Sequence, residues 1–196
     1  MSAAGTPGVW GARYLEHLSR LLGEPVDRAA FEQDPSAPAI EVLTFSAPEG
    51  CLTFCTLGLT HHRAELSGYR EILLPLAAGW DDGPALLANL SFFAVQSRLA
   101  LDRGVAVGGM GEAVPGFAGA FGKDAIYLGE PFWLPPEARR VAGPAGAEGR
   151  LLSAWPIAAP EYEFLRAHGA ERFEERFADS HLDPFDPRRP AFDVTA

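Results

Sequence analysis

Two adjacent histidines stand out in the stretch 56-TLGLTHHRAEL-66, where His61 and His62 are followed by Glu65. Imidazole and carboxylate groups are zinc ligands and general acid–base catalysts. Only a helix would bring His61 and Glu65 to one face, and on a strand the two histidines would point to opposite sides. The stretch lies between two predicted strands, so a helix of useful length is not expected here.

Two interpretations of this histidine pair stay open. One is a metal-dependent hydrolase that uses His61, His62 and a remote carboxylate. However, the zinc pattern H-E-x-x-H is absent, and a catalytic zinc commonly takes three protein ligands, so His168 or His181 would have to arrive through folding. The other interpretation, which the sequence favours, is an exposed polar connection between strands.

Other nucleophiles carry little sign of catalysis. In the predicted strand 51-CLTFCTL-57, Cys51 and Cys55 lie on one face about 13 Å apart, too far for a disulfide, and their apolar surroundings predict buried free thiols. Lys123, the only lysine, has no obvious activating neighbour. The serine patterns G-x-S-x-G and S-x-x-K are absent.

The glycine-dense segment 105–122 and the residues after it fail both phosphate-binding patterns. The stretch 116-GFAGAFGKD-124 has one residue too many for a Walker A loop, and Asp124 stands where a hydroxyl should bind magnesium. Val114 occupies the third glycine position of the dinucleotide fingerprint. We therefore expect no nucleotide, no other cofactor and no resident metal, and a loop whose backbone needs glycine.

Composition narrows the class of protein further. The chain has 196 residues, a hydrophobic fraction of 47% and a formal charge of −10. Such acidity argues against nucleic-acid binding and permits a basic partner. No signal peptide and no membrane span are expected, so the predicted location is the cytoplasm.

Periodicity and turn residues predict an α+β fold. Strands come in pairs rather than in strict alternation with helices, which favours an α/β sandwich with a mixed, largely antiparallel sheet flanked by helices. We expect one domain over 1–196, with a core of about 10–178, an irregular segment at 24–39 and an extended tail over 179–196. The predicted helices are 9–23, 83–104 and 160–178, the last with a break near Gly169. The predicted strands are 40–46, 51–59, 69–76, short pieces within 125–134, and 150–158. The turn 47–50 joins the first two strands, and a surface loop at 135–149 precedes the last.

The order of these landmarks resembles the Suppressor of fused-like domain family, as found in bacteria. The stretches that carry the resemblance are 42-VLTFSAPEGCLTFCTLGLTHH-62, 70-REILLPL-76, 127-YLGEPFWLPPE-137 and 152-LSAWPIAAPEYEFLRAHGAERFEERF-177. The chain departs from the family pattern in its shortened loop with the histidine pair and in its glycine-rich segment. The resemblance implies an α/β sandwich that binds proteins and has no enzymatic activity.

The same resemblance implies a role, because many bacterial members look like immunity proteins that neutralise toxins. We therefore expect a protein or peptide partner, such as a basic toxin domain, gripped at an exposed sheet edge and the loops 59–68 and 105–122. The candidate partner-binding residues are His61, His62, Arg63, Glu65, Met110, Glu112 and Phe117. A third possibility is a small-ligand site between the glycine-rich segment and the aromatic pair Phe132 and Trp133.

Overall fold

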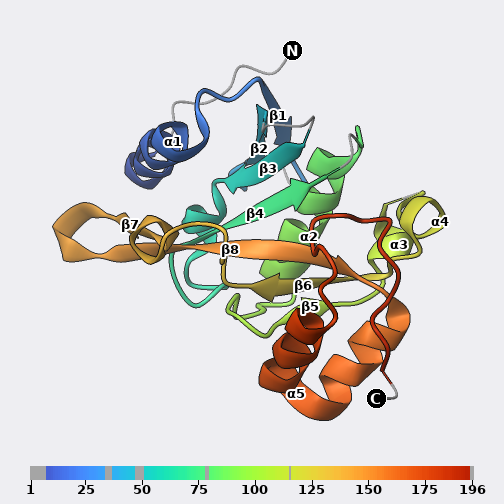
Figure 1. Ribbon diagram of the computed structural model, residues 1–196. Helices are drawn as coiled ribbons and strands as arrows, with labels where there is room; N and C mark the ends of the chain where they lie inside the picture. The colour runs from blue at the N-terminus through green and yellow to red at the C-terminus, as the bar shows by residue number, and fades with distance from the viewer. Residues whose placement is uncertain (1–7, 34–36, 47–50, 78–79, 115, 195–196) are drawn as a thin grey trace.

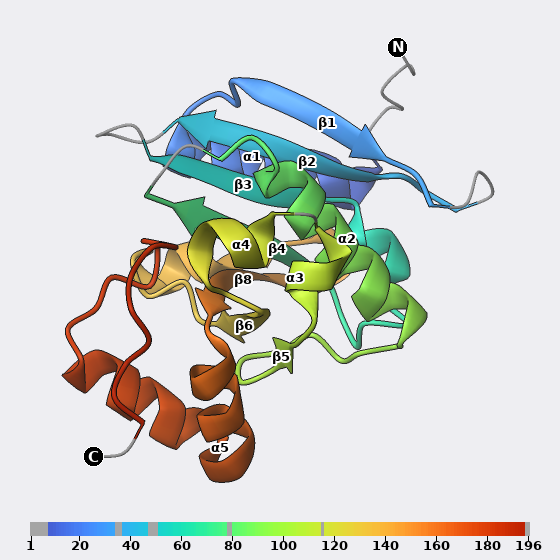
Figure 2. The same cartoon turned by 90° about the vertical axis from the view of Figure 1, so that its right-hand side faces the viewer.

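The computed structural model describes residues 8–33, 37–46, 51–77, 80–114 and 116–194, and the predicted turn 47–50 lies outside them. Helices flank both faces of a mixed sheet, as Figures 1 and 2 show. The helices are α1 (Val9–Leu22), α2 (Gly83–Gln96), α3 (Met110–Ala113), α4 (Phe117–Phe121) and α5 (Ala159–Asp179), with 3₁₀ turns η2 (Leu59–His62), η3 (Pro136–Arg139) and η4 (Pro144–Gly146). The strands are β1 (Asp27–Phe31), β2 (Ile40–Ser46), β3 (Leu52–Leu57), β4 (Arg70–Leu76), β5 (Ala106–Val107), β6 (Ala125–Gly129), β7 (Arg140–Ala142) and β8 (Glu148–Ile157).

The sheet has the strand order β1-β2-β3-β4-β8-β6-β5, and β7 also pairs with β8. All neighbouring strands are antiparallel except β4 and β8. This parallel pair joins the N-terminal meander β1–β4 to the C-terminal strands. The expected mixed, largely antiparallel sheet flanked by helices is therefore confirmed.

Alternation of side chains along the strands divides the core into layers. One face, which includes Ile72 of β4 and Leu152 of β8, packs against α2, α3 and α4. The opposite face is shared, because α1 covers its β2–β4 half and α5 covers its β6–β8 half. Figure 2 shows α1 behind the sheet and α2 in front of it. We call these the α2 face and the α1/α5 face.

Close backbone approach fixes α1 on the β7–β8 hairpin. A Cβ at Gly149 would overlap the Tyr14 hydroxyl, and one at Gly143 would overlap the Trp10 ring. Tyr14 is fully buried, and its hydroxyl donates to the carbonyls of Tyr69 and Arg150 at 3.2 Å each. Glycine at these positions therefore gives the aromatic side chains of α1 room to reach the sheet.

Most predicted elements are present, and three expectations about local structure are wrong. Residues 24–39 are not wholly irregular, because the half-exposed edge strand β1 pairs with β2. The helix predicted over 83–104 ends at Gln96, where Arg98 takes a positive φ of 49° and stops it. The predicted loop 135–149 contains β7. The break in α5 is confirmed at Gly169, whose φ is 81°.

Residues 180–194 form no helix or strand, yet a buried ion pair holds this tail against the rest of the fold. Arg189 donates to both Glu161 carboxylate oxygens at 2.6 and 3.1 Å, and it also donates to the Pro156 carbonyl. The side chains of Arg189 and Glu161 are 2% and 0% exposed. Lys123 is also buried and donates to the Arg189 carbonyl at 2.6 Å, and burial lowers the pKa of this amine.

The Arg189→Ala variant should lose about 3–5 kcal/mol in free energy of unfolding, because the buried carboxyl of Glu161 would lose its ion-pair partner. Urea denaturation measures this loss. Arg172→Ala is the matched control, since this arginine also pairs with a glutamate but is 70% exposed, and it should cost less than about 1 kcal/mol. Equal losses in the two variants would contradict the role assigned to the buried pair.

Candidate partner-binding surface

The histidine pair lies on the 3₁₀ turn η2, which begins after Gly58. Gly58 has a φ of 125°, a conformation that glycine adopts readily. Glu71 anchors the turn, because its Oε1 accepts hydrogen bonds from the backbone N–H groups of Gly58 at 2.9 Å and Thr60 at 3.4 Å. A carboxylate on β4 thus fixes the start of the segment that carries His61 and His62.

Glu71 is completely buried on the α1/α5 face. Burial raises the pKa of this carboxyl to about 7, against 4.5 for an ordinary glutamate, although hydrogen bonds from Thr56 and from the backbone of η2 oppose the shift. Its Oε2 has no hydrogen-bond partner among the described residues. The segment 59–68 is therefore held by an acid that titrates near neutral pH.

The candidate residues of this segment differ in accessibility. His61 and Arg63 are exposed, whereas His62 and Glu65 are half-buried. Burial lowers the pKa of His62, which favours the neutral imidazole. Arg63 lies 5.3 Å above the Tyr69 ring and contacts its hydroxyl. The exposed loop expected from the sequence is thus a short ordered turn.

The glycine-rich segment 105–122 folds differently from the expected loop. Of the three candidate residues in this segment, Met110 and Phe117 are 3% and 0% exposed and pack in the core of the α2 face. The third, Glu112, is exposed. Phe117 contacts Trp80, beyond the end of β4, with ring centroids 5.5 Å apart. Phe117 thus packs beyond the end of β4, whereas η2 is anchored by Glu71 near the start of this strand.

The described residues contain no group of three or more histidine, cysteine, aspartate or glutamate side chains that could hold a metal. The third ligand required by the metal-dependent hydrolase interpretation is therefore not found in the part of the chain that the structure describes. For the small-ligand interpretation, the ring contacts found for Phe132 and Trp133 in the described part of the chain are with residues outside the glycine-rich segment. The rings of Phe132 and Trp133 contact Phe185 on the α1/α5 face.

An apolar groove of about 390 Å³ opens on the α1/α5 face, between α1 and the C-terminal tail. Its walls come from segments far apart in the chain: Leu21 and Leu22 of α1, Phe45 of β2, Cys51, Trp133 and Phe185. Both cysteines are free, as expected, but only Cys55 is fully buried, and Cys51 lies half-buried at the groove. Asp183 adds a negative charge to the rim.

The tail forms one wall of this groove. Phe185 stacks on Phe132 at 5.6 Å with nearly parallel rings, and its carbonyl accepts the Ala77 N–H at 2.8 Å beyond the end of β4. Phe132 itself is 52% exposed. The ion pair at Arg189, four residues farther along the chain, therefore helps to shape a surface over the α1 half of the same face.

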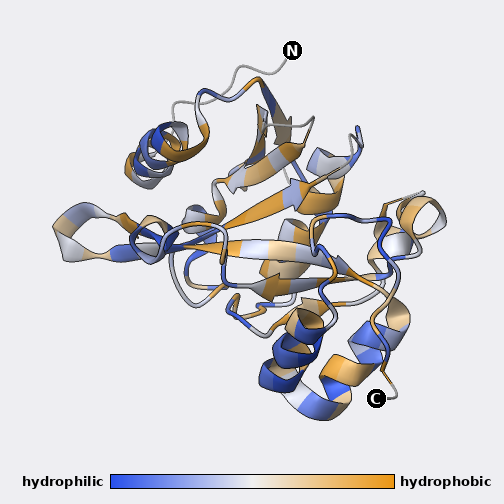
Figure 3. Cartoon of the chain, viewed as in Figure 1, coloured by the Kyte–Doolittle hydropathy of each residue, from blue (hydrophilic) through white to orange (hydrophobic). Residues whose placement is uncertain are grey.

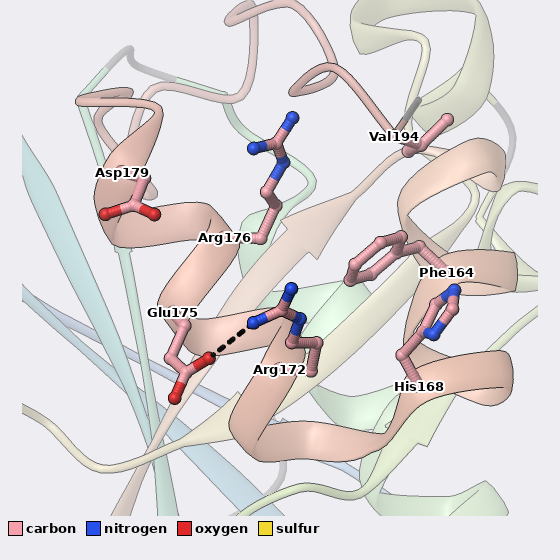
Figure 4. Close-up of a pocket in the computed structure, with 7 residues that line it drawn as sticks. All are labelled: Phe164, His168, Arg172, Glu175, Arg176, Asp179 and Val194. Atoms are coloured by element: carbon pink, nitrogen blue, oxygen red, sulfur yellow. Dashed lines mark hydrogen bonds and ion pairs between the residues drawn. The ribbon is translucent and has the colours of Figure 1, made fainter. Parts of the chain in front are cut away.

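A second hollow, of about 270 Å³, lies inside the bend of α5 (Figure 4). Phe164 and His168 line it from the first half of the helix, and Val194 lines it from the tail. Its charged groups are balanced, with Arg172 and Arg176 against Glu175 and Asp179. Its lining is mainly hydrophilic, in keeping with the hydrophilic colour of α5 in Figure 3, so the groove is the better apolar site.

Sequence reasoning missed the groove and Glu71 for different reasons. The groove joins residues from both ends of the chain, and no local pattern connects Leu22 with Phe185. A charged residue inside the apolar run 70-REILLPL-76 was the available signal for Glu71, because such a residue needs an internal partner when the strand is buried.

Comparison with known proteins decides the family. Residues 36–190 match the model of the Suppressor of fused protein (SUFU) family, which is well over half of the chain. The chain belongs to the SUFU family. The resemblance inferred from the sequence is thereby confirmed. No curated protein shows significant sequence similarity to the chain.

Solved structures of SUFU proteins share this fold. A SUFU homologue from Neisseria gonorrhoeae is 16% identical, with a TM-score of 0.71 over 93% of this chain and 96% of its own. Drosophila Suppressor of Fused gives a TM-score of 0.70 at 12% identity, and the match covers 97% of this chain but 53% of the Drosophila chain. A chain in the crystal structure of the Sufu–Fu complex gives 0.62 at 12% identity, over 91% and 86% of the two chains.

The SUFU match includes η2, Glu71, the strands beneath the groove and Arg189, whereas α1 and β1 precede it. The α1 wall of the groove is thus contributed from outside the matched region. Within the described residues, no helix is long and apolar enough to cross a membrane.

Replacing Glu71 by glutamine should change how stability depends on pH. The folded protein binds this proton more tightly than the unfolded chain, so the contribution of Glu71 is full below pH about 4.5 and is lost as pH rises through about 7. The loss is on the order of 3 kcal/mol, because a tenfold difference in acid dissociation corresponds to about 1.4 kcal/mol.

Urea denaturation from pH 4 to 8 measures this effect. The Glu71→Gln variant keeps an oxygen acceptor for Gly58 and Thr60 but does not titrate, so its stability should fall less than that of the parent between pH 4.5 and 7. Glu148→Gln, at an exposed site, should follow the parent. Parallel curves for Glu71→Gln and the parent would show that the pKa of Glu71 is the same in the folded and unfolded states.

Proposed function

We propose that this chain is a non-enzymatic protein-binding module that neutralises a toxin in the manner of an immunity protein. Membership of the SUFU family supports the binding role, and a structural relative was crystallised as the Sufu–Fu complex. The role as an immunity protein is an inference from the family resemblance and from the acidic character of the chain. The proposed site of action is the cytoplasm.

The observation that carries the binding role is the apolar groove between α1 and the tail. Leu21, Leu22 and Trp133 at its walls are half-buried, so an apolar side chain of a partner would remove additional hydrocarbon surface from water. Burial of such a side chain contributes about 1.5–3 kcal/mol. The occupant that fits is an apolar anchor residue, the kind of contact that dominates protein interfaces.

Charge indicates the neighbours of that anchor. Asp183 lies at the groove, and the whole chain carries a formal charge of −10. A partner that presents a basic residue beside its apolar anchor would meet complementary charge, which speeds association. A basic, nucleic-acid-degrading toxin domain has this chemistry. We also propose that the exposed residues His61, Arg63 and Glu112, which do not line the groove, contact the partner.

Affinity capture with the purified chain tests the role, using the products of neighbouring genes as prey. A stable complex that suppresses the toxicity of the captured protein is the expected result. A captured partner without toxicity would support binding and exclude the role of an immunity protein. A chain that captures none of these products would count against both parts of the proposal.

Substitutions at the groove test its position. Leu21→Lys and Ala77→Lys should each weaken binding of the captured partner at least about tenfold, because a charged group would replace apolar contact area. Ala12→Lys is the control, since Ala12 is exposed on α1 and does not line the groove. Calorimetric titration measures the affinities. Equal affinities for the groove variants and the control would exclude the groove as the contact site.

A further inference from the structure

Three arginines occupy directly opposed positions on three adjacent strands. Arg150 of β8 is in register with Arg70 of β4 on one side and with Arg140 of β7 on the other. Directly opposed residues share a face of the sheet, and here it is the α2 face, because Arg70 and Arg150 alternate with residues of the α1/α5 face. We call Arg70, Arg150 and Arg140 the arginine row.

Such a row is electrostatically unfavourable on its own, because like charges at directly opposed positions repel. Within the described residues, Glu148 is the one carboxylate within ion-pair distance of Arg140 and Arg150, at 3.4 and 3.6 Å. Arg70 donates to the carbonyls of Leu101 and Tyr69 and has no ion-pair partner in that part of the chain. One glutamate thus serves two of the three arginines, and the third has only carbonyl acceptors.

The row borders a small pocket of about 110 Å³ between the end of β6 and the start of β7. Its lining includes Arg139, Arg140 and Arg150, together with Glu130, which lies 3.9 Å from Arg139. With Glu148, the row and the pocket together bring four arginines and two glutamates to this surface. The side chains of Arg140 and Arg150 are 62% and 44% exposed, so a partner can reach them.

We propose that the arginine row and the adjacent pocket bind an acidic segment of a partner protein. The carboxylates of that segment accept hydrogen bonds from Arg140 and Arg150. Guanidinium groups bind carboxylates through paired, charge-assisted hydrogen bonds. Neighbouring strands are about 4.8 Å apart, so successive arginines suit carboxylates spaced as in an extended or helical acidic run. This surface lies on the α2 face, away from the groove.

A protein segment fits this surface better than a nucleic acid does. The chain carries a formal charge of −10, so an extended polyanion that leaves the row would meet repulsion from the rest of the molecule. A short acidic segment can end within the row. The inference depends on the proposed protein-binding role only for the class of ligand, and the geometry of the row is independent of the groove.

Calorimetric titration with a capped hexaglutamate peptide at low ionic strength tests the proposal. The double variant Arg140→Gln, Arg150→Gln should bind the peptide at least about tenfold more weakly, through the loss of two charge-assisted contacts. Arg166→Gln, Arg172→Gln is the matched control, because it removes the same charge from exposed arginines that are 63% and 70% accessible, and it should stay within about twofold of the parent.

Glu148→Gln gives a test in the opposite direction. It removes the carboxylate that occupies the arginines in the free protein, so hexaglutamate should bind about threefold more tightly. Equal weakening by the two double variants, or no binding of the peptide to the parent, would overturn the proposal. So would tighter binding of a hexathymidylate that depends on Arg140 and Arg150. None of these outcomes affects the groove, which is tested by Leu21→Lys.

Discussion

The buried ion pair between Glu161 and Arg189 joins three parts of the molecule. Glu161 also accepts the backbone N–H groups of Ala158 at the start of α5 and of Phe192 in the tail, so both of its oxygens are satisfied. Arg189 lies 4.5 Å from the Phe177 ring. Hydrogen bonds to both carboxylate oxygens help to offset the cost of burying the charge of Glu161. The tail, and with it the Phe185 wall of the groove, follows from this arrangement.

A second buried carboxylate, Glu71 on β4, also holds an irregular segment in place, but its pKa differs from that of an ordinary glutamate. Glu161 has an arginine as its partner, whereas Glu71 has only hydroxyl and backbone donors. Desolvation is therefore only partly compensated at Glu71, and the pKa of its carboxyl rises toward neutrality. One carboxylate fixes the tail, and the other fixes the turn with the histidine pair. The two acids give the irregular segments of the fold defined positions.

The two surfaces proposed for binding lie on opposite faces of the sheet and differ in chemistry. The groove is apolar, has an acidic rim and depends on the tail. The arginine row is polar and depends on the register of β4, β8 and β7. A sheet covered by helices on both faces exposes such surfaces only where the helices leave its ends open. Figure 1 shows the β7–β8 hairpin projecting beyond the helices at one such end.

Local sequence patterns were sufficient to predict α1, the β2–β3 hairpin, β4, β8, the break at Gly169 and the family. Periodicity and turn residues act over a few positions, so such features can be predicted without the tertiary structure. They misassigned Met110 and Phe117, since a glycine-rich stretch resembles a loop until α2 and Trp80 offer it a core to pack against. Tertiary structure alone decided the ion pair between residues 28 positions apart, the groove and the arginine row. The arginine row depends on strand register, and the ion pair and the groove depend on the path of the tail. Neither register nor that path is encoded in a local pattern.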